Sequence, residues 1–320
     1  MKHNILITGG FGLLGKPMVL KLINLRHNVF ILEKKNSKRQ KFLPKKPKKI
    51  IAGDFTNKNL VGKIIKENKI DVIFHLGAIT QVLESLKKPY ETHLINIMGT
   101  INFLENIRTI NKNIIFIYSS SDNAYGELKN RKEYKEGDSL DSTYPYDVSK
   151  SSSDLICQSY SKTYSMRVGI IRCGNIYGPG DFNLKRLIPE VILSTIKKEK
   201  FVIRSDGKST RDYVYVDDVV DAYLKLFEKI KKSRVKLKIY NVSSKFNYSV
   251  LQIVNMILKK MGNLKLKPII LNNSKQELNF QRLNYSKIQH ELKWKPKTDI
   301  DIGIKKTIEW YIRFYNFLKK

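Results

Sequence analysis

The chain has 320 residues, of which 42% are apolar and 10% aromatic, so it has enough apolar sequence for a folded core and the composition argues against extensive disorder. Sixty Lys and Arg residues against 29 Asp and Glu give a formal net charge of +31, which is typical of proteins that bind nucleic acids or membrane surfaces. However, 48 of these basic residues are Lys and only 12 are Arg, the residue best suited to bind bases and phosphates, so the composition favours a background excess of Lys over nucleic-acid binding.

The N-terminus and the cysteines indicate the compartment. The first apolar run is short and ends at Gly9, whereas a membrane span needs ~20 apolar residues and a signal peptide needs a longer apolar core. The two cysteines, Cys157 and Cys173, have neither the spacing of a metal site nor that of a disulfide framework. We therefore expect a soluble, cytoplasmic protein with no metal and no membrane partner.

The first half of the chain alternates short apolar runs with helical stretches such as Gly12–Leu25. Strands separated by helices are typical of a parallel sheet covered on both faces. The sequence therefore predicts an α/β fold with a doubly wound, Rossmann-type parallel sheet. Its predicted strands are Ile5–Thr8, Val29–Leu32, Asp71–Phe74, Ile114–Tyr118 and Val168–Ile171.

A glycine-rich segment lies between the first predicted strand and the first predicted helix. Gly9, Gly12 and Gly15 are spaced as in dinucleotide-binding turns, where glycine permits a tight turn and a close approach of the backbone to a pyrophosphate. The strand before it and the helix after it are the context that this motif requires. The segment therefore predicts a dinucleotide cofactor.

Two acidic residues follow at the ends of later strands. Glu33 ends the second strand, where its carboxylate would accept hydrogen bonds from the adenosine ribose and repel a 2′-phosphate, so NAD is favoured over NADP. Asp54 follows Ile50-Ile51 and would bond the adenine amino group. The basic stretch Lys34–Lys49 between them is predicted to be a solvent-exposed loop.

The pattern changes after about residue 178. A helix after Pro189, a strand at Phe201–Arg204, a β-like segment at Arg211–Val216 and three further helices predict a smaller lobe that exchanges strands with the first. We expect an NAD-binding domain at 1–178 plus about 213–242 and a second, C-terminal substrate-binding lobe at 179–212 plus 243–320. The three helices are predicted at Asp217–Ile230, Val250–Met261 and Ile302–Leu318.

Tyr146 and Lys150 form a Y-x-x-x-K pair at the start of a predicted helix. The spacing of four residues places both side chains on one helix face, where a Lys ammonium stabilises a phenolate and lowers the pKa of the tyrosine from about 10. The Ser-rich end of the strand at Ile114–Tyr118 lies upstream, and strand ends of a doubly wound sheet face the ligand crevice. Ser121 is therefore predicted to meet Tyr146 there.

Six ordered motifs are spread over nearly the whole chain. They are Thr8–Gly15 with Gly53-Asp54, Phe74–Ala78 with Asn96–Thr100, Tyr118–Gly126, Pro145–Lys150, Arg172–Gly180 and Gly207–Asp218. Together they resemble the extended short-chain dehydrogenase/reductase family of NAD-dependent nucleotide-sugar epimerases and dehydratases.

The resemblance implies a role for each site residue. Tyr146 would take the proton of the sugar 4-hydroxyl, Lys150 would bind the nicotinamide ribose, and Ser121 would hold the reacting oxygen. On the substrate side, Asn175 and Arg211 would meet the diphosphate, the latter with its planar fork. Arg186 would approach the nucleotide, and an equally weighted alternative for it is a surface ion pair.

The residues after Ser121 bear on the choice between two reactions. Loss of water across C5–C6 needs an acid at the 6-hydroxyl and a base at C5, whereas 4-epimerisation needs neither. In similar dehydratases two residues after the catalytic Ser or Thr supply these groups. Asp122 fits the acid, but Asn123 cannot accept a proton, so Glu127 or another group would have to be the base.

We therefore expect a nucleotide-diphosphate-sugar 4,6-dehydratase, with a 4-epimerase as the alternative and a non-catalytic NAD-binding or nucleic-acid-binding protein as a remote third. The expected partner is a nucleotide-diphosphate sugar, not a nucleic acid. The resemblance also implies a homodimer, formed through apolar stripes on the helices predicted at Thr92–Thr109 and Asp147–Tyr164.

Overall fold

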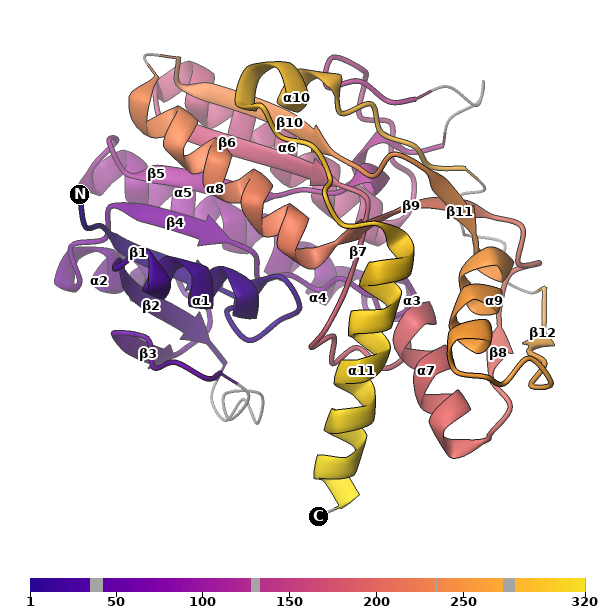
Figure 1. The fold of residues 1–320 in the computed structure, drawn as a ribbon. Coiled ribbons are helices and arrows are strands. Elements are labelled where there is room, and N and C mark those ends of the chain that lie inside the picture. Colours follow the sequence, from indigo (N-terminus) through magenta and orange to yellow (C-terminus); the bar gives the residue numbers. More distant parts are fainter. Residues whose placement is uncertain (35–42, 128–132, 234, 273–279, 320) are drawn as a thin grey trace.

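A seven-stranded parallel sheet forms the centre of the protein (Figure 1). The computed structural model describes residues 1–34, 43–127, 133–233, 235–272 and 280–319, so part of the basic stretch Lys34–Lys49 lies outside the described residues. Every neighbouring pair of strands in this sheet is parallel. Their spatial order is β10 (Leu237–Val242), β6 (Arg167–Cys173), β5 (Ile115–Ser119), β4 (Val72–His75), β1 (Asn4–Thr8), β2 (Asn28–Glu33) and β3 (Lys49–Ala52).

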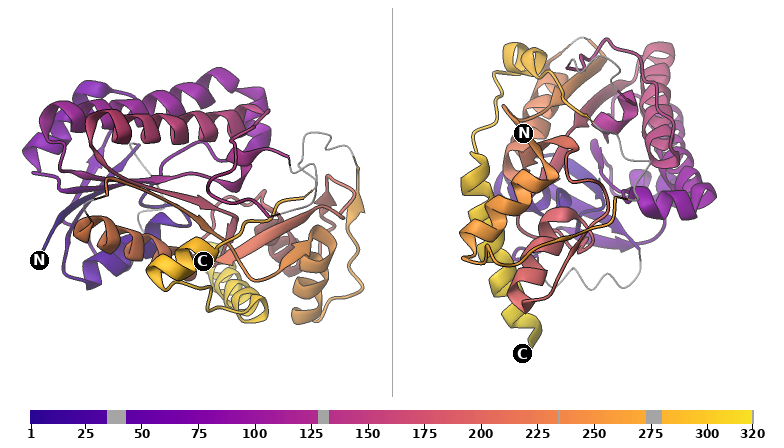
Figure 2. Two further views of the ribbon diagram at one scale, coloured as in Figure 1. Left: turned by 90° about the horizontal axis from the view of Figure 1, so that it is seen from above. Right: turned by 90° about the vertical axis from the view of Figure 1, so that its right-hand side faces the viewer.

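Helices cover both faces of this sheet, and the left view of Figure 2 shows it edge-on between the two helical layers. Alternate residues of each strand point to opposite faces, so Ile5 and Ile7 pack in one core while Leu6 packs in the other. The first core lies under α1 (Gly15–Asn24), α8 (Val216–Lys232) and α10 (Ser286–Leu292). The second lies under α2 (Lys58–Glu67), α5 (Gly99–Ile110) and α6 (Pro145–Tyr164).

A smaller lobe lies beside the carboxyl ends of the large sheet. Its three-stranded sheet contains β7 (Asn175–Tyr177), β9 (Thr210–Tyr215) and β11 (Asn247–Ser249), and a two-stranded sheet pairs β8 (Val202–Ile203) with β12 (Ile269–Ile270). Helices α7 (Leu187–Lys197), α9 (Val250–Lys260) and α11 (Ile300–Lys319) share a separate apolar core with β7, β8, β9 and β11. The predicted fold class is therefore confirmed.

Two predicted helices differ in detail from the structure. The first begins at Gly15, three residues later than predicted, because the residues after Gly9 form a turn. The helix predicted at Thr92–Thr109 is assembled from α4 (Pro89–His93), a π-helical segment η2 (Leu94–Met98) and α5, and α3 (Val82–Lys87) precedes it. Within η2, Asn96 exchanges two hydrogen bonds with the backbone of Ile79, a contact that local periodicity does not reveal.

Within the part of the chain that the structure describes, none of the helices is both long and apolar enough to cross a membrane.

Candidate active site

The glycine-rich turn joins β1 to α1 and needs glycine at two positions. Gly9 has a φ of +67°, and a Cβ atom there would lie 3.0 Å from the backbone nitrogen of Gly77. A Cβ on Gly15 would lie 2.1 Å from the Gly9 carbonyl oxygen, and the Gly12 amide donates to that same oxygen at 3.0 Å. The turn therefore brings bare backbone to the N-terminus of a helix, an arrangement that fits a pyrophosphate.

One large cleft, of about 1320 Å³, runs from this turn to the smaller lobe. Because all seven strands are parallel, their carboxyl ends lie at one edge of the sheet, and the cleft follows that edge. It is lined by all but one of the site residues predicted from the sequence, namely Gly9, Gly12, Gly15, Glu33, Ser121, Asp122, Tyr146, Lys150, Asn175, Arg186 and Arg211.

Asp54 is the exception, since it is not among the described residues that line the cleft. Its carboxylate accepts hydrogen bonds of 2.9 Å from the backbone and the hydroxyl of Thr56, and it lies 3.6 Å from Lys34 Nζ. In this structure Asp54 therefore shapes the turn after β3, beside the cofactor end of the cleft.

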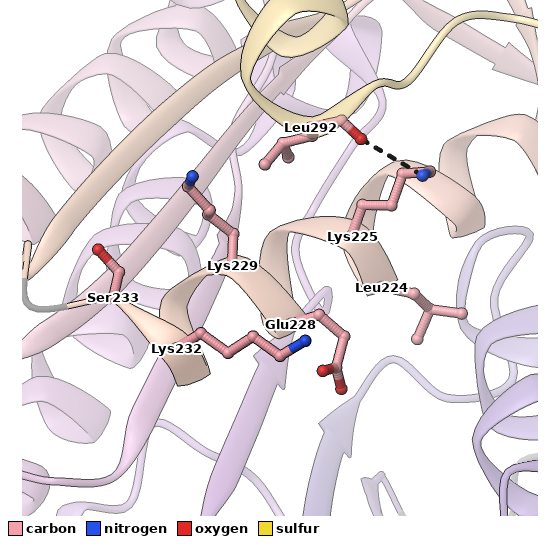
Figure 3. A pocket seen from close by; sticks show the side chains of 7 residues that line it. All are labelled: Leu224, Lys225, Glu228, Lys229, Lys232, Ser233 and Leu292. Atoms are coloured by element: carbon pink, nitrogen blue, oxygen red, sulfur yellow. Dashed lines mark hydrogen bonds between the residues drawn. The ribbon is translucent and has the colours of Figure 1, made fainter.

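A second hollow, of about 720 Å³, lies on the outer side of α8 and contains none of the predicted site residues. Figure 3 shows its lysines, Lys225, Lys229 and Lys232, and the hydrogen bond of 3.3 Å from Lys225 to the carbonyl oxygen of Leu292. It lacks the glycine turn and the Tyr146–Lys150 pair, so the cleft at the sheet edge is the candidate active site.

Tyr146 and Lys150 lie on the first turns of α6, which begins at Pro145, a residue favoured at helix starts. Lys150 is buried and donates a hydrogen bond of 2.7 Å to the Ser119 carbonyl oxygen at the end of β5. Burial lowers the pKa of Lys150 to about 8, although the nearby Cys157 and Asp154 oppose the shift. The lysine is thus held at the sheet edge by the adjacent strand.

Ser121 meets Tyr146, as the sequence predicts. Burial raises the pKa of the Tyr146 hydroxyl, and a hydrogen bond with the Ser121 side chain opposes that rise. The sequence predicts that Lys150 lowers this pKa. In the structure Lys150 is instead hydrogen-bonded to Ser119, and burial is the largest influence on the pKa of Tyr146. A positive charge bound beside the phenol would lower the pKa of Tyr146, the direction that the sequence predicts.

Two buried carboxylates, Asp122 and Asp147, accompany Tyr146 in the cleft. Asp122 Oδ1 accepts hydrogen bonds of 2.9 Å from the Ser121 hydroxyl and the Asn123 amide, whereas its buried Oδ2 has no partner among the described residues. Burial raises the pKa of Asp122 to about 6 and that of Asp147 to about 6. Both groups can therefore exchange protons near neutral pH.

Sequence reasoning missed Asp147 and the connections of Asn123. Asn123 Nδ2 donates to Asp147 Oδ1 at 2.7 Å, and Gln281 Nε2 donates to Asn123 Oδ1 at 2.7 Å. Asp147 stands inside the Pro145–Lys150 motif, so an acid directly after the tyrosine was the available signal. Gln281 gave none, because it is 158 residues from Asn123 in the chain.

The substrate side of the cleft carries Asn175 at the start of β7, Arg186 at the N-cap of α7 and Arg211 on β9. Arg211 Nη1 donates to the Thr210 carbonyl oxygen at 2.9 Å, and its charge opposes the rise that burial causes in the pKa of Asp122. Arg186 Nη1 lies 3.1 Å from Asp181 Oδ2. Arg186 thus forms an ion pair, one of the two alternatives considered for it, and also lines the cleft.

Comparison with known proteins places this geometry in context. The family model described as "NAD dependent epimerase/dehydratase family" matches residues 5–243. Human dTDP-D-glucose 4,6-dehydratase is 30% identical over 319 residues, which cover 96% of this chain and 89% of the human protein.

Two solved structures are similar over nearly their whole length. UDP-glucose 4-epimerase from Thermotoga maritima, with UDP-glucose, has a TM-score of 0.89 at 26% identity and covers 98% of this chain and 99% of that one. dTDP-glucose 4,6-dehydratase from Bacillus anthracis, in complex with NAD, has a TM-score of 0.87 at 25% identity and covers 98% of each chain.

These findings confirm the predicted family and the use of NAD, and the glycine turn supplies the backbone cradle that this cofactor needs. The match extends through the large sheet and includes Tyr146, Lys150 and the strand ends that surround them. The chain belongs to the NAD-dependent epimerase/dehydratase family of nucleotide-sugar enzymes.

Proposed function

We propose that the protein is a nucleotide-diphosphate-hexose 4,6-dehydratase. The observation that carries the proposal is Asp122, a buried acid directly after Ser121, whose Oδ2 has no hydrogen-bond partner in the described structure. A protonated carboxyl group beside the reacting tyrosine supplies the acid that water loss requires and that 4-epimerisation does not.

In the proposed reaction, Tyr146 takes the proton of the sugar 4-hydroxyl while Ser121 holds that oxygen. Lys150 keeps the tyrosine deprotonated when its ammonium is turned to the site. Bound NAD supplies the oxidant that accepts the hydride of C4 and returns it at the end of the cycle. Asp122 then donates a proton to the departing 6-hydroxyl.

The two ends of the cleft divide the binding of cofactor and substrate. We assign the glycines of the turn, Glu33 and Asp54, together with Tyr146 and Lys150, to NAD; Glu33 favours it over NADP because a carboxylate repels a 2′-phosphate. Asn175, Arg186 and Arg211 are assigned to the nucleotide diphosphate. These assignments divide the chain into an NAD-binding domain, 1–178 plus about 213–242, and a substrate-binding lobe, 179–212 plus 243–320.

A 4-epimerase is the second candidate. The observation in its favour is Asn123, a neutral amide whose nitrogen and oxygen are both hydrogen-bonded, which leaves the position after Asp122 without a base. The similarity to the Thermotoga maritima UDP-glucose 4-epimerase agrees with either reaction, because both begin with oxidation at C4.

The test is incubation of the purified protein with UDP-, GDP-, CDP- and dTDP-hexoses, followed by NMR of the products. We expect a 4-keto-6-deoxy sugar from one of them. A 4-epimer that keeps its C6 hydroxyl would support the second candidate and refute the first. The absence of any product, together with no absorbance of reduced cofactor at 340 nm, would refute both.

A further inference from the structure

Elimination of water from a 4-keto hexose needs a base at C5, and Asn123 does not provide one. Its amide is neutral, its nitrogen donates to Asp147 Oδ1 at 2.7 Å, and its oxygen accepts from Gln281 at 2.7 Å. Asn123 is therefore fixed at both ends of its amide. Any base has to come from another group on the cleft wall.

Glu127, which the sequence offered for this role, is exposed and does not belong to the described lining of the cleft. Asp147 does line the cleft, follows Tyr146 directly in the chain, and is only 2% exposed. Its carboxylate lies one hydrogen bond beyond the Asn123 amide. Among the described residues, it is the buried acid adjacent to Tyr146 on the same helical turn.

The hydrogen-bond partners of Asp147 and Asp122 suit the two acids to different roles. Asp147 lies in the first turn of α6, where the helix dipole favours an anion, and it accepts the Asn123 amide hydrogen; both features favour its carboxylate form and oppose the rise of its pKa on burial. Asp122 Oδ2 is buried and has no partner in the described part of the chain, and such an oxygen favours the protonated form. The charge of Asp122 is among those that raise the pKa of Asp147. A protonated Asp122 and an ionised Asp147 provide one acid and one base.

We propose that Asp147 is a further catalytic residue, the base that removes the C5 proton. The proposal rests on the proposed dehydratase function. The Asp147 carboxylate takes the proton, the electron pair of the C5–H bond forms the C5–C6 double bond, and the C6–O bond breaks with its pair. The proton of Asp122 joins the departing hydroxyl, so one water leaves and Asp147 holds the proton that later returns to C5.

The test compares the wild type with Asp147→Asn in D₂O, using the hexose nucleotide that the panel identifies. C4 oxidation is followed at 340 nm, and C5 exchange and water loss are followed by NMR. We expect Asp147→Asn to oxidise C4 and accumulate reduced cofactor, while C5 exchange and elimination fall by about 10²- to 10⁴-fold, the usual contribution of a positioned base. Glu127→Gln is the matched control and should behave as the wild type.

A double variant, Asn123→Glu with Asp147→Asn, returns a carboxylate to the neighbouring position and should recover part of the exchange. Elimination at the wild-type rate in Asp147→Asn would overturn the assignment. Loss of both C4 oxidation and elimination would also overturn it, because Asp147 would then act on the fold or on the first step. A wild type that oxidises C4 but yields a 4-epimer would instead overturn the proposed function, so the two failures are distinguishable.

Discussion

Tyr146 is the residue on which the proposed chemistry depends. Its side chain is hydrogen-bonded with Ser121 and lines the cleft between the cofactor and substrate ends. Tyr146→Phe removes the oxygen that takes the 4-hydroxyl proton, so we expect turnover per bound NAD to fall by about 10²- to 10⁴-fold. Tyr144→Phe, one residue before the helix begins, is the matched control. Steady-state assay and cofactor extraction measure the effect, and wild-type turnover in Tyr146→Phe would contradict the role.

Asp212 makes stability depend on pH. It is fully buried, its Oδ2 accepts hydrogen bonds from Ser243 and from the Leu283 amide, and its Oδ1 has no partner among the described residues. Burial raises the pKa of Asp212 to about 7 from 3.8. The folded state therefore keeps a proton that the unfolded chain releases, and the stability that this proton contributes is present below pH ~4 and lost as pH rises toward 7.

Asp212→Asn cannot titrate, so the variant should lack this loss. The free energy of unfolding of the variant minus that of the wild type should therefore increase between pH 5 and pH 8 by an amount on the order of 2 kcal/mol. Urea denaturation at the two pH values measures it. Asp206→Asn, at an exposed turn, should leave the pH dependence as it is. An unchanged slope in Asp212→Asn would show that Asp212 is ionised in the folded protein at both pH values.

At the scale of elements, a buried ion pair joins β6, α6 and the 3₁₀ turn η3 (Asp122–Tyr125). Arg172 on β6 makes two hydrogen bonds of 2.9 Å to the Asp154 carboxylate on α6 and a third, also 2.9 Å, to the Tyr125 hydroxyl. Both charged side chains are almost completely buried. The turn that carries Asp122 is thus tied to the helix that carries Tyr146.

Arg172→Met leaves the Asp154 charge buried without its cation, and this should cost about 3–5 kcal/mol of unfolding free energy. Replacing both partners, with Asp154→Leu added, should recover much of the loss. Arg108→Met breaks the more exposed pair with Glu105 and should cost much less, because solvent screens such a pair. Equal losses for Arg172→Met and Arg108→Met in chemical denaturation would contradict this account.

Local sequence patterns predict a helix or strand well when a single run of residues determines that element. The strands at Ile5–Thr8 and Ile114–Tyr118 are short apolar runs with period-two packing, and the structure places both in the sheet. The π-helical segment η2 depends on the contact of Asn96 with Ile79, and the link from Gln281 through Asn123 to Asp147 depends on residues from three parts of the chain. Such contacts arise from tertiary packing, so no local pattern predicts them.

At the scale of the whole molecule, α4, η2 and α6 contact one another, and each carries exposed apolar side chains. These side chains include Tyr90, Leu94, Met98 and Leu155, which are 39–77% exposed. Apolar patches of this kind favour association, and the sequence predicts a homodimer through the same helices. We expect light scattering to give twice the chain mass of 37.3 kDa, and Met98→Asp with Leu155→Asp to give a monomer. A monomeric wild type would contradict the prediction.

The central claim is that the protein removes water from a hexose nucleotide by way of a 4-keto sugar. The most direct measurement uses the hexose nucleotide that the panel identifies, carrying deuterium at C4, and locates the label in the product by NMR. In a dehydration, the hydrogen removed from C4 returns to C6. We predict a 4-keto-6-deoxy product with deuterium at C6, whereas a C6-hydroxylated 4-epimer with deuterium still at C4 would contradict the account.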